Sequence, residues 1–286
     1  MPISSEIVGR RGEPLVHGID ARWTMAYAAG LGDLAPAYLD TLARSDVLAH
    51  PLFPVCFEWP LFLDPRCMPT DLETADRIRG VHASHDLRLH RPVRAGMELT
   101  TRATLAKVEA RRSGAYQLAR LDTIASDGEP VSTTWYGMLY RDVEVAGDDR
   151  SLEDTPAAVE PAPADDELKE HRIAIAPNAA LVYTECARIW NPIHTDTAVA
   201  KAAGLPEPIL HGTATLALAV SRVVAECFDG DAERVSRIAA RFGAMVRMPS
   251  TLSLRIGPVR DNSVRFEVLE PEGGRAIRDG LLTVRR

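Results

Sequence analysis

The residues between 183 and 212 have the types and spacing most suited to chemistry. Asn191-Pro192-Ile193-His194 stands where an apolar helix must end, because proline breaks a helix. The side chains of Asn191 and His194 are therefore predicted at a helix terminus beside a buried core. An unperturbed imidazole titrates near pH 6.5, so this histidine could act as base and as acid at neutral pH. The alternative is structural, since Asn-Pro is a common turn pair and a lone histidine at a helix end usually has no catalytic role.

A second kind of group comes from Leu210-His211-Gly212, which opens a long apolar helix over about 213–228. The amides in the first turn of a helix lack intrahelical acceptors and carry positive partial charge. Gly212 has no side chain to shield its N–H, which therefore suits a developing oxyanion. We expect His211 to shape the entrance of this helix, where a substrate would bind.

The elements that would hold these groups occur twice in the chain. When the sequence is aligned with itself after a shift, three matches appear in the same order. Residues 27–40 align with 183–196 at an offset of 156 residues, residues 51–55 with 208–212 at 157, and residues 93–94 with 246–247 at 153. In the first match a tyrosine, a proline and the final aspartate coincide. The matches indicate an internal duplication, and the alternative is chance similarity between amphipathic segments.

Both halves place helices before strands. Apolar helices are predicted over about 20–30 and 180–188, and a short helix that Thr195 or Asp196 can cap precedes the long helix of the second half. Strands are predicted over 98–110, 115–126, 131–143, 251–259, 264–269 and 276–284. Helices before a run of antiparallel strands favour an α+β fold, with a sheet wrapped on a central helix, over a βαβ alternation.

An acidic segment rich in proline and alanine, residues 146–168, is predicted to link domain 1–145 to domain 169–286. Between residues 146 and 170 lie nine acidic and two basic residues, so this stretch carries the whole net charge of −7 and the remainder is neutral. The charge would keep the linker solvated, and the alternative is a partner-binding role. Neither part offers the basic surface that nucleic-acid binding requires.

Composition and absent motifs exclude other classes of protein. The chain has 286 residues, of which 46% are hydrophobic and 26% charged, which excludes global disorder, collagen and coiled coil. No apolar run approaches the roughly 18 residues of a membrane span, and residues 1–14 lack the apolar core of a secretory signal. Four cysteines without Cys-x-x-Cys spacing indicate free thiols and a cytoplasmic protein.

Motifs for nucleotides and metals are missing as well. Gly30-Leu-Gly32 begins a dinucleotide-type pattern, but the third glycine and the preceding strand are absent. His82 and His85 could be a metal pair, yet they have no third ligand and are predicted to be ordinary strand or loop residues. We therefore predict neither a metal nor a bound cofactor.

The order Tyr183-Thr-Glu, Asn191-Pro192-Ile193-His194-x-Asp196 and Ala-Gly-Leu-Pro-x-Pro-Ile-Leu-His211-Gly212 resembles the MaoC-like, or (R)-specific enoyl-CoA hydratase 2, family of hot-dog proteins. Leu89-His-Arg-Pro-Val-x-Ala-Gly is similar to the strand entry of the double hot-dog members. The resemblance implies two hot-dog domains, of which the first has lost the catalytic motif. It also implies an acyl thioester of CoA or an acyl carrier protein as substrate, no membrane, and a homodimer.

This sequence departs from the family pattern at one position. The family signature reads Ser-Gly-Asp-x-Asn-Pro-x-His, whereas Ile189 stands here in the place of the aspartate. Isoleucine cannot take a proton. The first half keeps Gly32-Asp33 at the matching position but has Ala35 and Tyr38 where the asparagine and histidine should be.

The resemblance implies hydration of a 2-enoyl thioester or dehydration of a 3-hydroxyacyl thioester. His194 would be the acid–base group, the Gly212 amide the oxyanion donor, and Asn191 would orient water or thioester. Three alternatives follow from Ile189: His194 works with Asn191 alone, Glu185 or Asp33 replaces the carboxylate, or the protein is a thioesterase or an acyl-binding subunit.

Arginines are the candidates for recognising the charged parts of such a substrate. Arg188 and Arg247, helped by Arg241, could bind a carboxylate or phosphate of the acyl thioester. The alternative for Arg188 is a solvated charge or an ion-pair partner.

Overall fold

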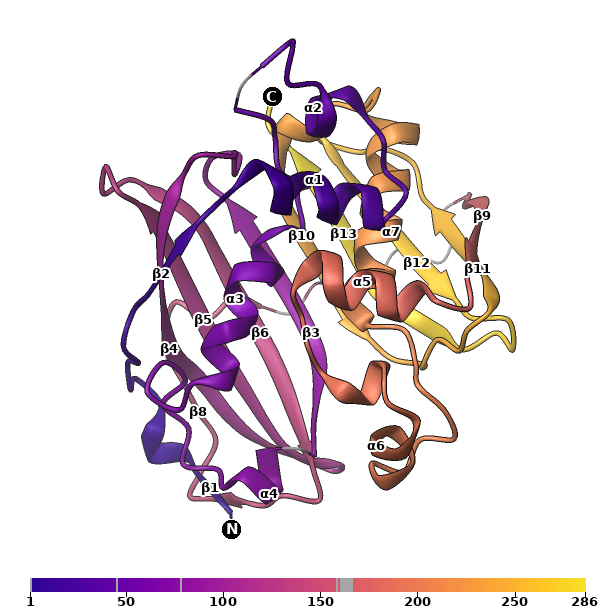
Figure 1. Ribbon diagram of the computed structural model, residues 1–286. Helices are drawn as coiled ribbons and strands as arrows, with labels where there is room; N and C mark the ends of the chain where they lie inside the picture. The colour runs from indigo at the N-terminus through magenta and orange to yellow at the C-terminus, as the bar shows by residue number, and fades with distance from the viewer. Residues whose placement is uncertain (1, 45, 78, 158, 160–166) are drawn as a thin grey trace.

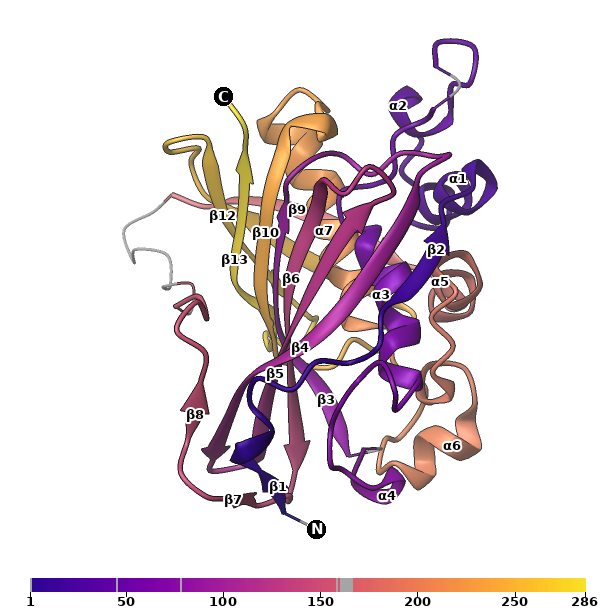
Figure 2. The same ribbon diagram turned by 90° about the vertical axis from the view of Figure 1, so that its left-hand side faces the viewer.

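The computed structural model describes the whole chain except residues 1, 45, 78, 158 and 160–166. Part of the predicted linker therefore lies outside the described residues. The chain is α+β, as predicted, and most of its strands form one large antiparallel sheet that curves around two helices (Figures 1 and 2). Each half of the chain supplies one central helix and one half of that sheet.

The N-terminal half holds the first set of elements. They are β1 (Ile3–Ser4), a 3-10 turn (Ser5–Ile7), β2 (Leu15–Gly18), α1 (Ala21–Gly30), α2 (Pro36–Leu39), α3 (Pro54–Leu63), α4 (Thr74–Arg77), β3 (Gly80–Leu89), β4 (Glu98–Arg111), β5 (Gly114–Ala125), β6 (Pro130–Arg141), β7 (Val145–Ala146) and β8 (Arg150–Ser151). Its central helix is α3.

The C-terminal half repeats the arrangement. It holds β9 (Lys169–Ile175), α5 (Ala179–Ala187), η2 (Pro192–His194), α6 (Thr197–Ala202), α7 (Gly212–Cys227), η3 (Ala232–Arg234), β10 (Val235–Phe242), β11 (Ser250–Ile256), β12 (Ser263–Leu269) and β13 (Arg275–Val284). Its central helix is α7, which is longer than α3 and begins at the glycine singled out from the sequence.

The two half-sheets join through β3 and β10, so the strand order runs β2-β4-β5-β6-β3-β10-β13-β12-β11-β9. The two strands are antiparallel, from Arg237 opposite Arg88 to Arg241 opposite Ser84. Arg237 donates two hydrogen bonds across this seam to Asp86, at 2.8 and 2.7 Å. Backbone pairing and a bidentate ion pair therefore hold the halves together.

The six predicted strands are present as β4, β5, β6, β11, β12 and β13, each with bounds shifted by a few residues. The sequence reading missed β3 and β10, the two strands of the seam. Their inward faces carry histidines and alanines beside the apolar residues, which weakens the alternation that marks a strand.

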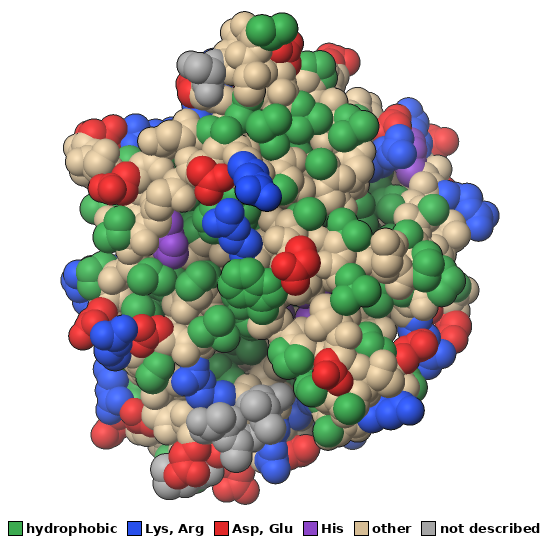
Figure 3. Space-filling model, viewed as in Figure 1, with side chains coloured by type: hydrophobic (Ala, Val, Ile, Leu, Met, Phe, Trp, Pro, Cys, Tyr) green, Lys and Arg blue, Asp and Glu red, His purple; other side chains and the backbone are tan. Residues whose placement is uncertain are grey.

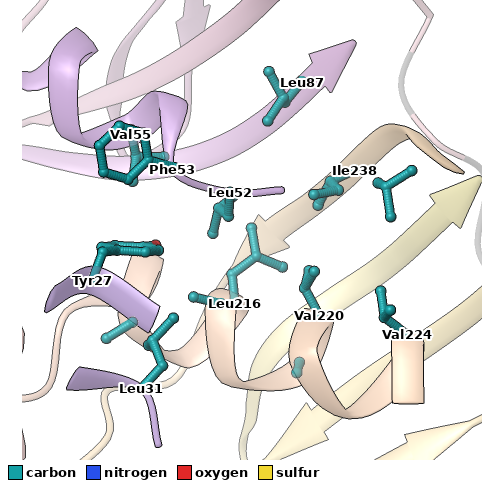
Figure 4. Close-up of a cluster of buried hydrophobic side chains, with 14 of the residues drawn as sticks. Tyr27, Leu31, Leu52, Phe53, Val55, Leu87, Leu216, Val220, Val224 and Ile238 are labelled. Atoms are coloured by element: carbon teal, nitrogen blue, oxygen red, sulfur yellow. The ribbon is translucent and has the colours of Figure 1, made fainter. Parts of the chain in front are cut away.

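The core fills the space between the central helices and the concave face of the sheet (Figure 4). One cluster spans both halves and contains Tyr27 of α1, Leu31 directly after α1, Leu52 and Phe53 before α3, Leu87 of β3, Leu216 and Val220 of α7 and Ile238 of β10. The small apolar residues all round α7 are buried, as predicted.

The repeat found in the sequence appears as a near-symmetric pair of helices. α1 and α5 pack against each other on the face shown in Figure 1. The hydroxyl groups of Tyr27 and Tyr183, the residues matched at an offset of 156, lie 3.4 Å apart at their contact. Both side chains are fully buried. The matched tyrosines therefore mark the axis that relates the halves.

Two findings limit the classes of site. No described helix has the length and hydropathy that crossing a bilayer would need. Within the described part of the chain, no three His, Cys, Asp or Glu side chains gather in a way that could hold a metal ion.

Candidate active site

The turn after α5 displays the first two candidate residues. The carboxamide oxygen of Asn191 accepts a hydrogen bond from the Ile193 N–H at 3.4 Å and caps η2, which ends at His194. Asp196 then caps α6 by accepting from Ala198 N–H and Val199 N–H, one of the two caps that the sequence predicts. The caps fix where the chain turns and so where the imidazole lies.

A backbone carbonyl fixes the tautomer of His194. Its Nδ1 lies 2.8 Å from the carbonyl oxygen of Ile209, so Nδ1–H donates to that carbonyl and Nε2 carries the lone pair. Burial lowers the pKa of His194 to about 4. The histidine is therefore neutral at physiological pH and presents a free base, in contrast to the titration near neutrality expected of an unperturbed imidazole.

His211 lies directly against His194. The two rings stack with centroids 3.6 Å apart and planes 25° from parallel. His211 is almost fully buried, its Nε2 lies 3.3 Å from the hydroxyl of Thr184, and its ring contacts Tyr183. Burial and the neighbouring His194 hold the pKa of His211 well below its usual value. His211 thus forms the wall on which His194 rests, at the mouth of α7.

Gly212 is the first residue of α7, with His211 as its N-cap. Among the described residues no backbone carbonyl accepts from the Gly212 N–H, as expected for the first turn of a helix. A Cβ at this position would lie 2.9 Å from Cδ1 of Phe242. Glycine is therefore required by the close approach of the Phe242 ring, and the residue has no side chain of its own to cover the amide.

Ile189 occupies the place of the family carboxylate and is buried. Among the described residues no carboxylate forms an ion pair or hydrogen bond with His194. Glu185 is exposed on α5. Asp33 accepts a hydrogen bond from the Ala35 N–H at 3.3 Å and acts electrostatically on Tyr38 and His50. In the described part of the chain, neither candidate replacement forms an ion pair or hydrogen bond with His194.

Each of the three arginines considered for substrate recognition contacts an acidic side chain of the protein itself. The Arg188 guanidinium lies 4.3 Å from the centroid of the Trp23 ring and 3.5 Å from Asp20, so it ties the end of α5 to the start of α1. Arg247 is exposed and lies 3.8 Å from Glu272. Arg241 pairs with Asp279. Their roles in substrate recognition stay predictions.

The N-terminal half keeps a counterpart of this site. The ring of His50 contacts those of Tyr27 and Tyr38 at 5.6 and 5.8 Å, as His211 contacts Tyr183 and His194 in the other half. The residue that follows His50 is Pro51, which has no N–H.

The contacts correct one of the sequence matches. An offset of 157 places Pro54 over His211, whereas the structure puts His50 there. Ala49 N–H donates to the Val93 carbonyl and Leu210 N–H to the Val246 carbonyl, both at 2.9 Å, and these bonds precede His50 and His211. Residues 51–53 form an extra turn before α3, which shifts the register. The match of residues 93–94 with 246–247 is confirmed.

Sequence reasoning missed three residues of the site: Thr184, Ile209 and Phe242. Thr184 and Ile209 act on the histidines through a hydroxyl and a backbone carbonyl, respectively. Phe242 reaches Gly212 from the end of β10, a strand that was not predicted. Only Thr184 had a signal, since it follows the repeated tyrosine.

The face above the site is rich in hydrophobic side chains. Figure 3 shows them gathered between scattered charges over the region of α1 and α5. Leu181, Val182 and Trp190 are among the exposed large hydrophobic residues of this region. An apolar rim beside a half-buried base suits a substrate with a hydrocarbon part.

Comparison with known proteins assigns both halves. Residues 159–275 match the MaoC like domain, and residues 6–134 match the FAS1-like, dehydratase domain region. The 3-hydroxyacyl-thioester dehydratase Y of Mycobacterium tuberculosis is 28% identical over 285 residues, which cover 96% of this chain and 95% of that protein. Enoyl-CoA hydratase ChsH3 of the same organism is 34% identical over 108 residues, only 34% of this chain and 37% of that protein.

Comparison with solved structures gives a similar result for the fold. A MaoC-like dehydratase from Phytophthora capsici superposes with a TM-score of 0.83 at 20% identity, over 98% of this chain and 96% of that one. Two dehydratase-type domains in series, one sheet wrapped on two helices and the duplicated tyrosine pair agree with one another. The chain therefore has the double hot-dog fold of the MaoC-like dehydratases, and its C-terminal half matches the MaoC like domain.

Proposed function

We propose that this protein is a hydratase/dehydratase that interconverts 2-enoyl and 3-hydroxyacyl thioesters at the site in its C-terminal half. The observation that carries the proposal is the contact between a neutral His194 with a fixed tautomer and the His211-Gly212 start of α7. The names of the relatives, enoyl-CoA hydratase and 3-hydroxyacyl-thioester dehydratase, describe the same reaction in its two directions.

The reaction needs a base, an acid and a donor to the thioester oxygen. In hydration, Nε2 of His194 takes a proton from water while the water oxygen bonds to C3 of the enoyl group. The electron pair of the double bond moves toward the thioester carbonyl, whose oxygen accepts from the Gly212 N–H. The imidazolium of His194 then returns a proton to C2, which gives the 3-hydroxyacyl thioester. Dehydration uses the same groups in reverse.

Asn191 and His211 serve this chemistry indirectly. Asn191 fixes the turn that carries His194 and orients water or thioester with its carboxamide NH2 group, since its oxygen is used in the cap. His211 supports the His194 ring by stacking and stays neutral because it is buried. The first of the three alternatives, in which His194 works without a carboxylate, is the one we adopt.

Ile189 favours a second candidate function. Without the family carboxylate the site could bind an acyl thioester and hydrolyse it, or bind it without reaction. The lost acid–base group would cost roughly 10²–10⁴ in hydration rate. CoA and an acyl carrier protein are both compatible carriers.

One assay separates these functions. Purified protein is incubated with a panel of 2-enoyl-CoA thioesters while the absorbance of the conjugated thioester and the release of free thiol are followed. Loss of absorbance without thiol release supports the hydratase, and the 3-hydroxyacyl product should then appear by mass spectrometry. Thiol release from every reactive substrate would instead establish a thioesterase. No reaction together with thermal protection by acyl-CoA would establish a binding protein.

A further inference from the structure

The N-terminal half buries two ionisable side chains that the proposed reaction does not use. Glu58 of α3 has no exposed area, and His85 of β3 is 1% exposed. The Thr134 hydroxyl donates to Oε1 of Glu58 at 2.5 Å, while Oε2 of Glu58 and both ring nitrogens of His85 have no hydrogen-bond partner among the described residues. Three polar atoms of these two side chains are thus buried without partners among the described residues.

Burial keeps both groups uncharged. It raises the pKa of Glu58 to about 8 and lowers the pKa of His85 to about 4. At neutral pH Glu58 therefore has an O–H donor to spare, and His85 has one N–H donor and one bare nitrogen. An unsatisfied buried polar atom costs about 1–3 kcal/mol in the free energy of folding. Packing alone would be served better by apolar side chains at these two positions.

The other half shows that the fold does not require them. The buried residues of α7 are threonine, alanine, leucine and valine only, and this helix fills its half of the sheet without a carboxyl group. The polar residues are therefore a property of the N-terminal half of this chain and not of a sheet wrapped on a helix.

A continuous series of rings connects this cluster to the proposed active site. Phe242 touches Gly212, and its ring centroid lies 4.4 Å from that of His82. The His82 ring stacks on Tyr136 at 3.7 Å, and both rings contact His85. A bulge between His82 and Ser84 lets His82 and His85 share one face of β3.

The solvent exposure of these side chains decreases along the series, from Phe242 to Glu58. Phe242 and His82 are partly exposed, whereas Tyr136, His85 and Glu58 are buried. Glu58 is near enough to Tyr136 to act on it electrostatically. An acyl group that extended from a thioester at Gly212 along these rings would thus end against the unpartnered atoms.

We propose that Glu58 and His85 form a subsite for a hydroxyl group carried by the distal part of the acyl chain. This rests on the proposed function only in that the thioester lies at Gly212. A hydroxyl oxygen can accept from the Glu58 O–H and donate its own proton in a hydrogen bond to the bare nitrogen of His85. A carboxylate would fit poorly, because burial opposes the protonation of His85 that would pair with it, and its charge would then be buried beside Glu58.

Binding of saturated acyl-CoA thioesters tests the subsite without requiring hydration. Calorimetry compares ω-hydroxyacyl-CoA with the unsubstituted acyl-CoA of equal length, over a series of lengths. At the best length the hydroxylated ligand should bind about 10-fold tighter or more, because it satisfies groups that the hydrocarbon leaves unpaired. Equal binding at every length, or preference for an ω-carboxyacyl-CoA, overturns the subsite.

Variants assign the preference to the two residues. Glu58→Met and His85→Phe should each reduce the ratio of affinities about 10-fold, whereas Glu58→Gln, which keeps a donor and an acceptor, should retain most of it. Leu61→Met, at a buried position of the same helix, is the control for repacking and should leave the ratio unchanged. A ratio that survives both Glu58→Met and His85→Phe contradicts the assignment.

Thermal unfolding distinguishes a binding role from a structural one. If Glu58 serves a ligand, Glu58→Met should keep or raise Tm, since it removes an unpaired polar atom; a clear loss of Tm in both Glu58→Met and Glu58→Gln marks a structural residue and overturns the subsite. The two proposals also fail separately. Hydration of enoyl-CoA without any hydroxyl preference sinks the subsite alone. A Glu58-dependent hydroxyl preference without hydration supports the subsite and sinks the hydratase.

Discussion

The two halves of the molecule place the same frame around different side chains. In each half a buried tyrosine contacts the histidine that precedes the central helix, at 5.6 Å for Tyr27 and His50 and at 4.9 Å for Tyr183 and His211. This histidine is kept even in the half that lacks the other site residues. Its retention there indicates a structural role, which is why we treat His211 as the support of His194 and not as the acid–base group.

The positions around that histidine are where the halves diverge. His194 of the C-terminal half has Tyr38 as its counterpart, and Gly212 has Pro51. A tyrosine whose pKa is raised by burial cannot act as a base at neutral pH, and a proline has no amide to offer an oxyanion. On a shared scaffold, the N-terminal half thus has Ala35, Tyr38 and Pro51 in the places of Asn191, His194 and Gly212, the three residues to which we assign the reaction.

The largest effect is expected when His194 is changed. His194→Ala should reduce kcat/KM for enoyl-CoA hydration by roughly 10²–10⁴, because the reaction loses its only base. Tyr38→Phe, the matched change in the other half, should leave kcat/KM within about 2-fold while circular dichroism shows both variants folded. Equal losses in the two variants would remove the distinction between the halves.

Gly212→Pro copies the N-terminal residue into the reactive half. It should lower kcat by roughly 10²–10³ through loss of one oxyanion donor, and proline is tolerated at the first position of a helix. Gly212→Ala is the control, because it adds the same Cβ against Phe242 but keeps the N–H. If steady-state kinetics show the two variants equally impaired, the effect is steric and the amide has no catalytic part.

Ile189→Asp restores the family carboxylate. We expect kcat for hydration to rise about 10-fold, since a second acid–base group would assist His194, while Tm falls because an acid replaces a buried isoleucine. Ile189→Asn introduces a polar side chain that cannot titrate and should show the loss of Tm only. An unchanged or reduced kcat for Ile189→Asp would mean that this site works by a different division of roles.

The smallest effect concerns the axis between the halves. A double-mutant cycle of Tyr27→Phe and Tyr183→Phe, followed by urea unfolding, should give a coupling energy of about 0.5 kcal/mol, because the hydroxyl contact is long and buried. Additive effects of the two substitutions on the free energy of unfolding would show that the two hydroxyl groups do not interact and that the tyrosine rings contribute through packing alone.

Several features of the fold and of the candidate site could be predicted from the sequence because they depend on interactions between residues that are close along the chain. The 3-10 turn that begins at Pro192 and the start of α7 at Gly212 follow from proline geometry and from helix periodicity, whereas α5 already ends at Ala187, where Arg188 takes the left-handed conformation. The duplication was visible because Tyr27 and Tyr183 recur in matching contexts. These features need only neighbours in the chain.

The remainder depends on contacts between distant residues. The seam strands β3 and β10, the ring of Phe242 against Gly212 and the carbonyl of Ile209 that fixes the His194 tautomer have no local signature. The lowered pKa of His194 arises from burial by other elements, so spacing alone suggested an ordinary imidazole. The register of His50 was missed because an extra turn separates it from α3.

The pH dependence of kcat/KM for enoyl-CoA hydration tests the central claim most directly, since it reports the protonation of the free enzyme. His194 is a base that must be neutral, and its pKa is lowered to about 4, so protonation should matter only in acid. The account predicts a flat profile between about pH 5 and about pH 7, with a decline toward pH 4. A loss of half the activity near pH 6.5, in protein that remains folded, would contradict it.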